Sequence, residues 1–348
     1  MKTHYQALYE RLKAGILSGA YPLGSRLPSK RIVAREAGVS VITVEHAFRL
    51  LCEEGYAESR ERSGFFAAYR DADAGDRPIP KRWTKPLTIN RHRVAEGFPW
   101  SAVARKLRTT VARYGERLLI KSPNNGTVEL REAIAAYLQR SRALRVSPAQ
   151  IVIGSGAEYL YGLLAQCFRG EAVAIEEPSY QKIRQVYEAH GMECEGLSLS
   201  ANGIGTSVLK AASSHVLHVT PYRSFPTDVT ADASKRREYV RWPEQRGGWL
   251  VEDDFGSEFS PARSGAETLF AIDGGRHVIY LNTFSKTFAP SLRIGYLVLP
   301  KGFQKLFAER VGFYSCTVPV LDQLFLADFI DSGDFERHVN RLRRRNVR

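Results

Sequence analysis

The chain has 348 residues, 44% of them hydrophobic, which is enough for more than one domain with a filled core. It carries 50 Lys and Arg against 37 Asp and Glu, a net charge of +13 that is compatible with a nucleic-acid partner. No apolar run is long enough to span a membrane or to form the core of a signal peptide, so composition excludes a membrane-spanning protein and predicts a cytoplasmic one.

The first 67 residues have the pattern of two helices joined by a tight turn and followed by a short hairpin. Apolar residues recur at helical spacing over residues 5–17. The helices expected over residues 29–36 and 40–54 each begin at a serine that can serve as N-cap. Residues 55–67 then alternate around a basic turn, as the strands of a wing do. A small helical protein-interaction domain is the alternative.

A linker is expected next. Residues 70–86 are charged, contain three prolines and lack helical or strand periodicity. The predicted division is a first domain over residues 1–70, a basic linker over 71–95 and a second domain over 96–348. Residues 81–150 hold 15 basic and 4 acidic side chains. These charges could contact DNA phosphates without regard to base sequence, or simply form a solvated surface.

Two apolar segments in the second domain end in groups that can hold a ligand. Residues 151–160 predict a strand, a glycine turn and a helix, and the free amides of a helix N-terminus bind phosphate. Residues 249–255 predict a strand that ends in Glu252, Asp253 and Asp254. A buried acid there needs a cationic partner, whereas the alternative is that the three acids only solvate a loop.

The strand predicted over residues 277–281 is followed by Thr283, Ser285 and Lys286. Lysine forms a Schiff base with a carbonyl once burial or a neighbouring cation lowers its pKa. The hydroxyls and Arg293 are suited to hold a phosphate. A surface loop with one solvated lysine is the alternative for this segment taken alone.

These segments occur in a characteristic order with several others: Leu130–Leu138, Ile151–Gly156, Glu177–Tyr180, Thr220–Pro221, Phe225–Thr227, Glu252–Phe255 and Thr283–Thr287. Together they resemble the fold-type I, aspartate-aminotransferase-like domain that binds pyridoxal 5'-phosphate (PLP), in the form found in MocR-type regulators of the GntR family. The resemblance implies an α/β fold of three layers with a mostly parallel sheet. Lys286 would hold the PLP aldehyde, Asp253 would pair with the pyridine nitrogen, and Tyr180 would stack on the ring, unless Tyr180 is a core residue.

The same resemblance assigns the PLP phosphate to one group of residues. Backbone amides of Gly156 and Ala157 would bind it, assisted by Ser285 and Arg293. A glycine turn before a helix is a common signal by itself.

The segment from Tyr5 to Ala67 resembles the GntR-type winged helix-turn-helix, an α+β DNA-binding domain whose second motif helix enters the major groove. The DNA-contact positions implied by the resemblance are Arg31, Ser40, Thr43, Arg62 and Gly64. Val41 stands where the family often has arginine, which would remove a phosphate or guanine contact or replace it by apolar contact with a thymine methyl.

Three departures from the PLP-domain pattern concern the site. Phe255 replaces the usual tyrosine, and Asp228 replaces a glycine in the turn that includes Arg223 and Ser224. Family members also continue beyond the position of Arg348 into a small lobe, so the sequence predicts a truncated domain that lacks this lobe. The basic helix expected near the end could meet phosphate or remain solvated.

The four cysteines, Cys52, Cys167, Cys194 and Cys316, are scattered without a metal-binding pair, which predicts free thiols, with Cys52 and Cys167 buried in helices. No metal site is expected.

The leading hypothesis is a PLP-dependent transcriptional regulator that binds a double-stranded DNA operator and senses PLP or an amino compound through aldimine exchange at Lys286. By resemblance it would be a homodimer. The alternatives are a class I/II aminotransferase with transaminase activity and a DNA-binding regulator whose PLP domain is vestigial.

Overall fold

A computed structural model describes residues 4–60, 63–69, 98–255, 258 and 267–346. The chain divides into two compact units, the first made of residues 1–76 with Ala231–Glu238 and the second of the remainder. The linker expected over residues 71–95 and the DNA-contact position Arg62 lie outside the described residues.

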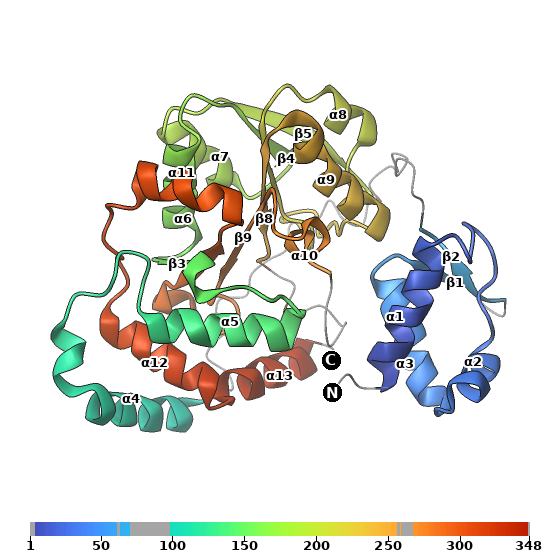
Figure 1. Ribbon diagram of the computed structural model, residues 1–348, viewed down its shortest axis with the longest axis horizontal. Helices are drawn as coiled ribbons and strands as arrows, with labels where there is room; N and C mark the ends of the chain where they lie inside the picture. The colour runs from blue at the N-terminus through green and yellow to red at the C-terminus, as the bar shows by residue number, and fades with distance from the viewer. Residues whose placement is uncertain (1–3, 61–62, 70–97, 256–257, 259–266, 347–348) are drawn as a thin grey trace. The chain divides into compact units, whose positions relative to one another are not determined.

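The first unit has the three helices and two-stranded wing that the sequence predicts (Figure 1). Its elements are α1 (His4–Leu17), α2 (Lys30–Ala37), α3 (Val41–Glu53), β1 (Ala57–Arg60) and β2 (Gly64–Ala67). The strands are antiparallel, with Ala57 opposite Ala67 and Arg60 opposite Gly64. A small apolar core joins the helices through Leu12, Val33, Val44, Phe48 and Leu51.

Local sequence sets the two turns of this unit. Ser29 and Ser40 each accept a hydrogen bond from the backbone amide three residues on, at 3.4 and 3.2 Å, as N-caps do. Gly38 ends α2 at a φ of 63°, a conformation that a residue with a Cβ atom adopts only with strain. The serine caps and the Gly38 turn are therefore confirmed.

The second unit is built on an eight-stranded sheet in the order β3-β10-β9-β8-β7-β4-β5-β6. The strands are β3 (Ile151–Gly154), β4 (Val173–Glu177), β5 (Cys194–Ser200), β6 (Gly203–Ile204), β7 (Val216–Val219), β8 (Trp249–Asp253), β9 (Val278–Thr283) and β10 (Gly295–Val298). The pairs from β9 through β5 are parallel, whereas β10 is antiparallel to β3 and β9, and β6 to β5. The carboxyl ends of β4, β7, β8 and β9 therefore meet at one edge.

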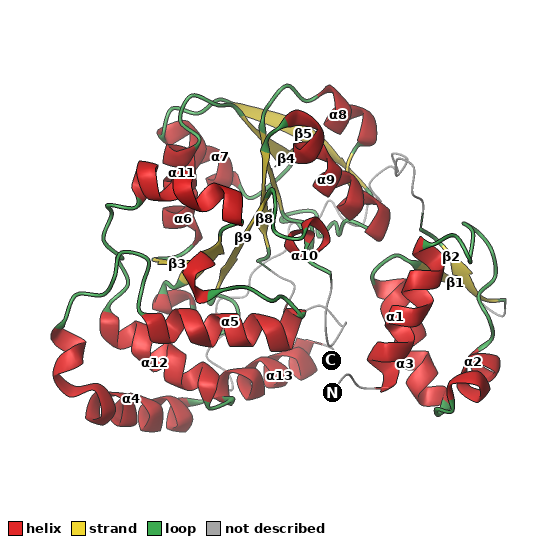
Figure 2. Ribbon diagram, in the orientation of Figure 1, coloured by secondary structure: helices red, strands yellow, loops and turns green. Residues whose placement is uncertain are grey.

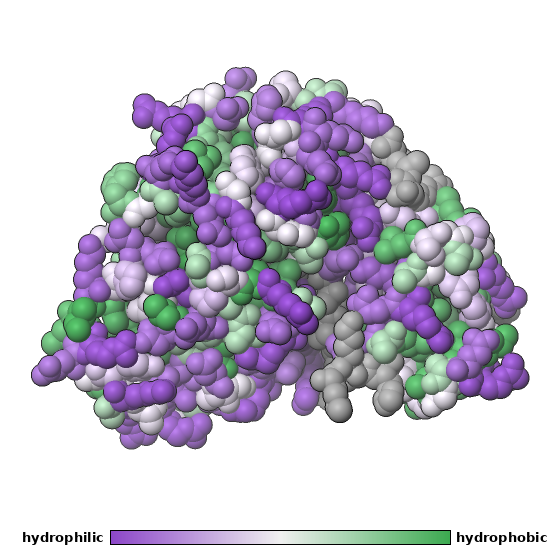
Figure 3. All heavy atoms as spheres, in the orientation of Figure 1, coloured by the Kyte–Doolittle hydropathy of each residue, from purple (hydrophilic) through white to green (hydrophobic). Residues whose placement is uncertain are grey.

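Helices cover both faces of this sheet (Figures 1 and 2). On one face α6 (Ala157–Cys167), α7 (Gln181–Ala189) and α11 (Lys301–Val311) pack on a core that includes Leu164, Ile183, Val251, Ile279 and Phe303. The visible outer surface of α11 is largely hydrophilic (Figure 3). The remaining α-helices of this unit are α4 (Trp100–Tyr114), α5 (Val128–Arg142), α8 (Thr206–Ala211), α10 (Leu269–Asp273), α12 (Val320–Asp331) and α13 (Asp334–Asn346). Helix α9 (Ala233–Arg246) belongs to the first unit up to Glu238 and to the second unit beyond it.

The sequence predicts no membrane-spanning segment, no metal site and no paired cysteines. No helix among them is long and apolar enough to cross a membrane. No group of histidine, cysteine and acidic side chains in the described ranges could hold a metal ion. The four cysteines are free, and Cys167 is buried as expected, but Cys52 is only half-buried.

Candidate functional site

Lys286 lies at the carboxyl end of the sheet, three residues beyond the last residue of β9. Its ammonium nitrogen is 3.6 Å from the centroid of the Phe255 ring, which follows the neighbouring strand β8. The two strands are parallel, with Asp253 opposite Leu281, so their ends are held side by side. This pairing brings the end of β9 that precedes Lys286 beside the acidic end of β8.

The environment of Lys286 favours its neutral amine. Part of the side chain reaches solvent, but its amine end is crowded by protein, and this burial lowers the pKa to about 8, with the Arg223 cation as the next cause. Glu258, Asp253 and Asp228 act in the opposite direction. A lysine whose pKa is near neutrality can act as a nucleophile, which is the chemistry that the sequence predicts for it.

Asp253 is a buried carboxylate, only 4% exposed, at the end of β8. Its Oδ2 atom accepts a hydrogen bond from the Tyr161 hydroxyl and lies 3.7 Å from Nε2 of His218. The hydroxyl of Tyr187 is 2.9 Å from Nδ1 of the same histidine. Burial and the charge of Asp253 hold the pKa of Tyr161 well above its usual range, so the phenol stays a neutral donor.

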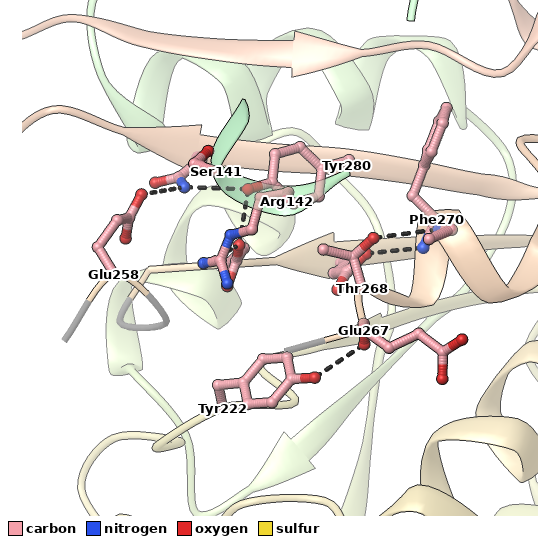
Figure 4. Close-up of polar contacts among 12 residues, drawn as sticks. Ser141, Arg142, Tyr222, Glu258, Glu267, Thr268, Phe270 and Tyr280 are labelled. Atoms are coloured by element: carbon pink, nitrogen blue, oxygen red, sulfur yellow. Dashed lines mark hydrogen bonds and ion pairs between the residues drawn. The ribbon is translucent and has the colours of Figure 1, made fainter. Parts of the chain in front are cut away.

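The alternative that the three acids at this strand end solvate a loop is wrong, because all three are buried. Glu252 accepts hydrogen bonds from the backbone amides of Leu269 and Phe270 at 2.8 and 2.9 Å (Figure 4). These amides belong to the first turn of α10, whose N-terminus favours a carboxylate. The sequence around Glu252 did not predict these partners, because they lie 17 and 18 residues further along the chain.

The third acid, Asp254, belongs to a buried network beside the strand ends. Arg142 donates to its Oδ2 atom at 3.0 Å and the Tyr280 hydroxyl donates to the same atom at 2.6 Å (Figure 4). The amide of Asn282 donates to the Tyr280 hydroxyl at 3.1 Å and to Glu258 at 2.7 Å. Burial is the largest single influence and lowers the pKa of Arg142, but Asp254, Tyr280 and Glu258 together outweigh it and hold this pKa well above its usual range. This network fixes the ends of β8 and β9.

Gly156, Ala157 and Arg293 form a cradle at the N-terminus of α6. Gly156 has a φ of 97°, and a Cβ atom placed on it would lie 2.8 Å from Nη2 of Arg293. The guanidinium therefore rests against the glycine backbone, beside the amides of the first helical turn. The Gly156 amide itself donates to the Gly154 carbonyl at 2.9 Å. Arg293 is 49% exposed and its Nη2 atom lies 3.7 Å from Glu158, too far for a hydrogen bond.

The hydroxyls near Lys286 differ in exposure. Thr283 is 6% exposed, and its buried Oγ1 atom has no hydrogen-bond partner among the described residues. A buried hydroxyl without a partner costs free energy unless a ligand supplies one. Ser285 is half-buried between Thr283 and Lys286. These donors, with the cradle at Gly156, fit a phosphate group.

Tyr180 is 39% exposed, so the alternative of a core tyrosine is wrong. It follows the turn after β4, and its ring meets Phe225 edge to face, with centroids 6.1 Å apart. The exposed ring is free to stack on a flat ligand, which stays a prediction.

The turn after β7 carries Asp228, which replaces the glycine expected from the family resemblance. Asp228 has a φ of 59°, the left-handed conformation that a glycine at this position would supply. Its carboxylate accepts a hydrogen bond from Nε of Arg223 at 2.7 Å. The turn therefore keeps a glycine-like backbone and gains a charge pair.

Sequence reasoning missed Glu176, which lies beside this turn. Its Oε2 atom accepts hydrogen bonds from the Ser224 hydroxyl at 2.6 Å and the Thr220 amide at 3.2 Å. Burial raises its pKa to about 8, and the charge of Asp253 adds to the rise. An acid at the end of the apolar run Val173–Ile175 was the available signal.

In the first unit, the expected DNA-contact residues other than Arg62 are exposed or half-exposed. Arg31 lies on α2, and Ser40 and Thr43 lie at the start of α3, with their hydroxyls 2.9 Å apart. Gly64 begins β2, with a φ of 107°. The structure thus brings Ser40 and Thr43 together.

Two further residues of this unit were not predicted. Ile42 is 69% exposed beside Val41, which is 43% exposed, so the start of α3 presents apolar side chains at the place where the family often has a basic contact. Arg26 lies against the wing, since a Cβ atom on Gly64 would be 3.4 Å from its Nε atom. Arg26 stands alone before Leu27, Pro28 and Ser29, and no sequence pattern there predicted that it contacts the wing.

Two family profiles match the chain. The profile described as bacterial regulatory proteins, gntR family, matches residues 4–67, and that of aminotransferase class I and II matches residues 86–345. The exact linker boundaries stay a prediction. The two matches follow the order of the two units.

Relatives with the same combination are known. The uncharacterized HTH-type transcriptional regulator YdeL of Bacillus subtilis is 34% identical, over 98% of this chain and 76% of its own length. The probable rhizopine catabolism regulatory protein MocR of Rhizobium meliloti is 30% identical, over 98% of this chain and 74% of its own.

Among solved structures, the alpha-aminoadipate aminotransferase LysN of Thermus thermophilus, complexed with N-(5'-phosphopyridoxyl)-L-leucine, superposes with a TM-score of 0.62 at 27% identity. The match covers 78% of this chain and 66% of that chain, so this protein spans just under two thirds of the enzyme's length. The fold of the second unit is that of fold-type I aminotransferases, as the sequence predicts. The chain belongs to the MocR-type HTH transcriptional regulators, which join a GntR-family domain to an aminotransferase class I and II domain.

Proposed function

We propose that this regulator binds PLP at Lys286 and that the occupancy of this site, by PLP or by an amino compound that reaches it, controls the binding of the winged helix to a double-stranded DNA operator. The observation that carries the proposal is the placement of a lysine of lowered pKa beside a buried carboxylate. Bound PLP would supply an aldehyde carbon and an electron-withdrawing pyridinium ring.

The residues of the site fit such a group from end to end. The Lys286 amine is the nucleophile for the aldehyde, and Asp253 offers a buried anion for the protonated ring nitrogen. The Tyr161 hydroxyl donates to that carboxylate and holds it in place, and Nε2 of His218 lies 3.7 Å from it. Tyr180 offers an exposed ring face for stacking.

The phosphate end is supported by a separate set of donors. The amide of Ala157, the first residue of α6, lies at the helix N-terminus, where an anion is stabilised, whereas the Gly156 amide donates to the Gly154 carbonyl at 2.9 Å. Arg293 adds a guanidinium against Gly156. Thr283 supplies a buried hydroxyl that lacks a partner within the described ranges, and Ser285 lies beside it.

On the DNA side, α3 is proposed to enter the major groove with Ser40 and Thr43 at its leading end. Arg31 on α2 and Arg62 with Gly64 at the wing are proposed to contact the phosphate backbone. A homodimer would present two such helices to paired half-sites. An effector can shift this equilibrium only through contacts that differ between the free and DNA-bound states.

A titration of the full chain with PLP, followed by absorbance between about 320 and 450 nm, tests the cofactor proposal beside Lys286→Ala. We expect a visible band in the wild type and none in the variant. An equal band in both proteins would place PLP elsewhere, and no band in either would favour a regulator with a vestigial PLP domain.

A second experiment tests the regulatory step. Random-sequence duplexes are enriched by rounds of binding to the full chain, and the Kd of the selected duplex is measured with and without PLP. We expect the Kd to change with PLP in the wild type and not in Lys286→Ala. A change in both proteins would show that PLP acts through another site.

Transaminase activity is a second candidate, favoured by the likeness to the Thermus thermophilus aminotransferase and by the lowered pKa of Lys286. A lysine with this pKa can take a proton from a carbon next to the amino group. Formation of a keto acid from added amino acids, absent in Lys286→Ala, would establish it.

A further inference from the structure

The turn between β7 and α9 carries two side chains in a conformation that such residues rarely adopt. Arg223 has a φ of 54° and Asp228 a φ of 59°. The turn is closed by hydrogen bonds from the Ser224 amide to Val229 at 2.8 Å and from the Asp228 amide to Ser224 at 2.7 Å. The Arg223 amide also donates to the Thr230 hydroxyl at 3.0 Å. These contacts hold the backbone of the turn, so the Cα positions of Arg223 and Asp228 are fixed.

This turn is anchored at the same edge of the sheet as Lys286. It leaves β7 after Val219, which pairs with Glu252 of β8, so Thr220 lies beside the strand end that carries Asp253. The buried carboxylate of Glu176 binds both Thr220 and Ser224 and ties the turn to β4. Because β4, β7, β8 and β9 are neighbours in the sheet, the turn, Asp253 and Lys286 all lie at the carboxyl edge of the sheet.

The Arg223 guanidinium has hydrogen-bond donors available for a ligand. Its side chain is 42% exposed, and Nε donates to Asp228 at 2.7 Å. Its two terminal nitrogens make no hydrogen bond to any other described residue. Arginine presents such a pair of N–H groups to a carboxylate in a bidentate geometry. Its charge also reaches Lys286, whose pKa it helps to lower.

We propose that Arg223 binds the carboxylate of an amino-acid effector whose amino group lies at Lys286, and that Asp228 positions the guanidinium for this contact. This inference rests on the proposed function, because the amino group is placed by the PLP site. An amine without a carboxylate would leave Arg223 without its anion. The site therefore favours amino acids over simple amines through attraction of Arg223 to the carboxylate.

Matched pairs of small molecules test the inference on the full chain loaded with PLP. The probes are alanine, β-alanine and γ-aminobutyrate, each compared with the amine that lacks its carboxylate, ethylamine for the first two and propylamine for the third. Binding is followed by the change in visible absorbance of the bound PLP. The proteins are wild type, Arg223→Gln and Arg169→Gln, where Arg169 is exposed on the turn after α6 and serves as a charge-matched control.

In the wild type, at least one amino acid is expected to bind at least about tenfold more tightly than its matching amine, the usual effect of a charge-assisted contact. Arg223→Gln is expected to reduce this ratio to below about threefold, and Arg169→Gln to leave it unchanged. Arg223→Lys keeps the charge without the bidentate geometry and should fall between.

Two results would overturn the inference. One is a wild type that binds each amino acid no better than its amine, and the other is a preference that survives in Arg223→Gln. Both leave the proposed function standing, because PLP is bound in each case. A chain that takes up no PLP at Lys286 would refute the proposed function and this inference with it.

Discussion

The ammonium nitrogen of Lys286 lies 3.6 Å from the centroid of the Phe255 ring. An ammonium over an aromatic face is stabilised by the ring quadrupole. The parallel pairing of β8 with β9 holds the two residues there. Phe255 stands where the family resemblance leads us to expect tyrosine, so the ring can contact the lysine but cannot donate a hydrogen bond to a bound ligand.

The first prediction concerns that missing hydroxyl. Phe255→Tyr should strengthen PLP binding about two- to tenfold, the usual range for one added hydrogen bond. A PLP titration followed by visible absorbance measures the Kd. Phe313→Tyr is the control, since Phe313 is 70% exposed. Unchanged or weaker binding in Phe255→Tyr would show that the phenol does not reach the ligand.

The second prediction concerns the pH dependence of PLP uptake. Only the neutral amine attacks an aldehyde, so the rate should rise with pH through the Lys286 pKa of about 8. Arg223→Gln removes a cation that lowers this pKa, so the midpoint should move to higher pH. Initial rates of uptake from about pH 6 to about pH 10 measure it. Arg169→Gln is the control and should leave the midpoint unchanged. An unchanged midpoint in Arg223→Gln would show that Arg223 does not lower the pKa of Lys286.

The third prediction concerns Glu176, whose folded-state pKa of about 8 lies above its ordinary value of 4.5. The folded state then binds more protons than the unfolded state. The contribution of Glu176 to the free energy of unfolding is therefore complete below about pH 4.5 and is lost as pH rises through about 8. Glu176→Gln should remove up to about 1.4 kcal/mol per pH unit from the slope of unfolding free energy in that window.

Urea unfolding at a series of pH values measures this slope. Tryptophan fluorescence reports on the second unit, because all four tryptophans follow residue 76. Glu171→Gln, at an exposed position, provides the control and should leave the slope unchanged. A wild-type slope in Glu176→Gln would mean that Glu176 does not gain a proton on folding.

The fourth prediction concerns DNA binding. Arg31 is exposed on α2, so Arg31→Ala should weaken binding to different duplexes about equally and reduce the dependence of log Kd on log salt by about one, as for one lost phosphate contact. Fluorescence anisotropy at several salt concentrations measures both. Arg169→Ala removes the same charge in the other unit. A loss confined to one base sequence would instead indicate that Arg31 reads a base.

Much of the fold could be predicted because its signals are local. The caps at Ser29 and Ser40 and the turn at Gly38 define the helix-turn-helix from adjacent residues alone. Lys286 and Asp253 could be identified because polar groups that follow apolar strands mark a sheet edge in any α/β fold.

Other parts of the site could not be predicted because their partners are distant in sequence. Asp254 is buried only because Arg142, 112 residues away, enters to neutralise it. Glu176 is held by Ser224, 48 residues away. Nothing adjacent to either acid predicts burial, so for Asp254 the solvated loop remained an alternative.

The sequence by itself determined the two-domain composition, the strand and helix pattern, and the residue types available for PLP and DNA. Only the tertiary structure decided that Arg223, Asp228 and Phe255 surround Lys286, because strand order brings together residues that follow β7, β8 and β9. The physical reason is that periodicity and capping act within a few residues, whereas burial and charge depend on every segment that folding places nearby.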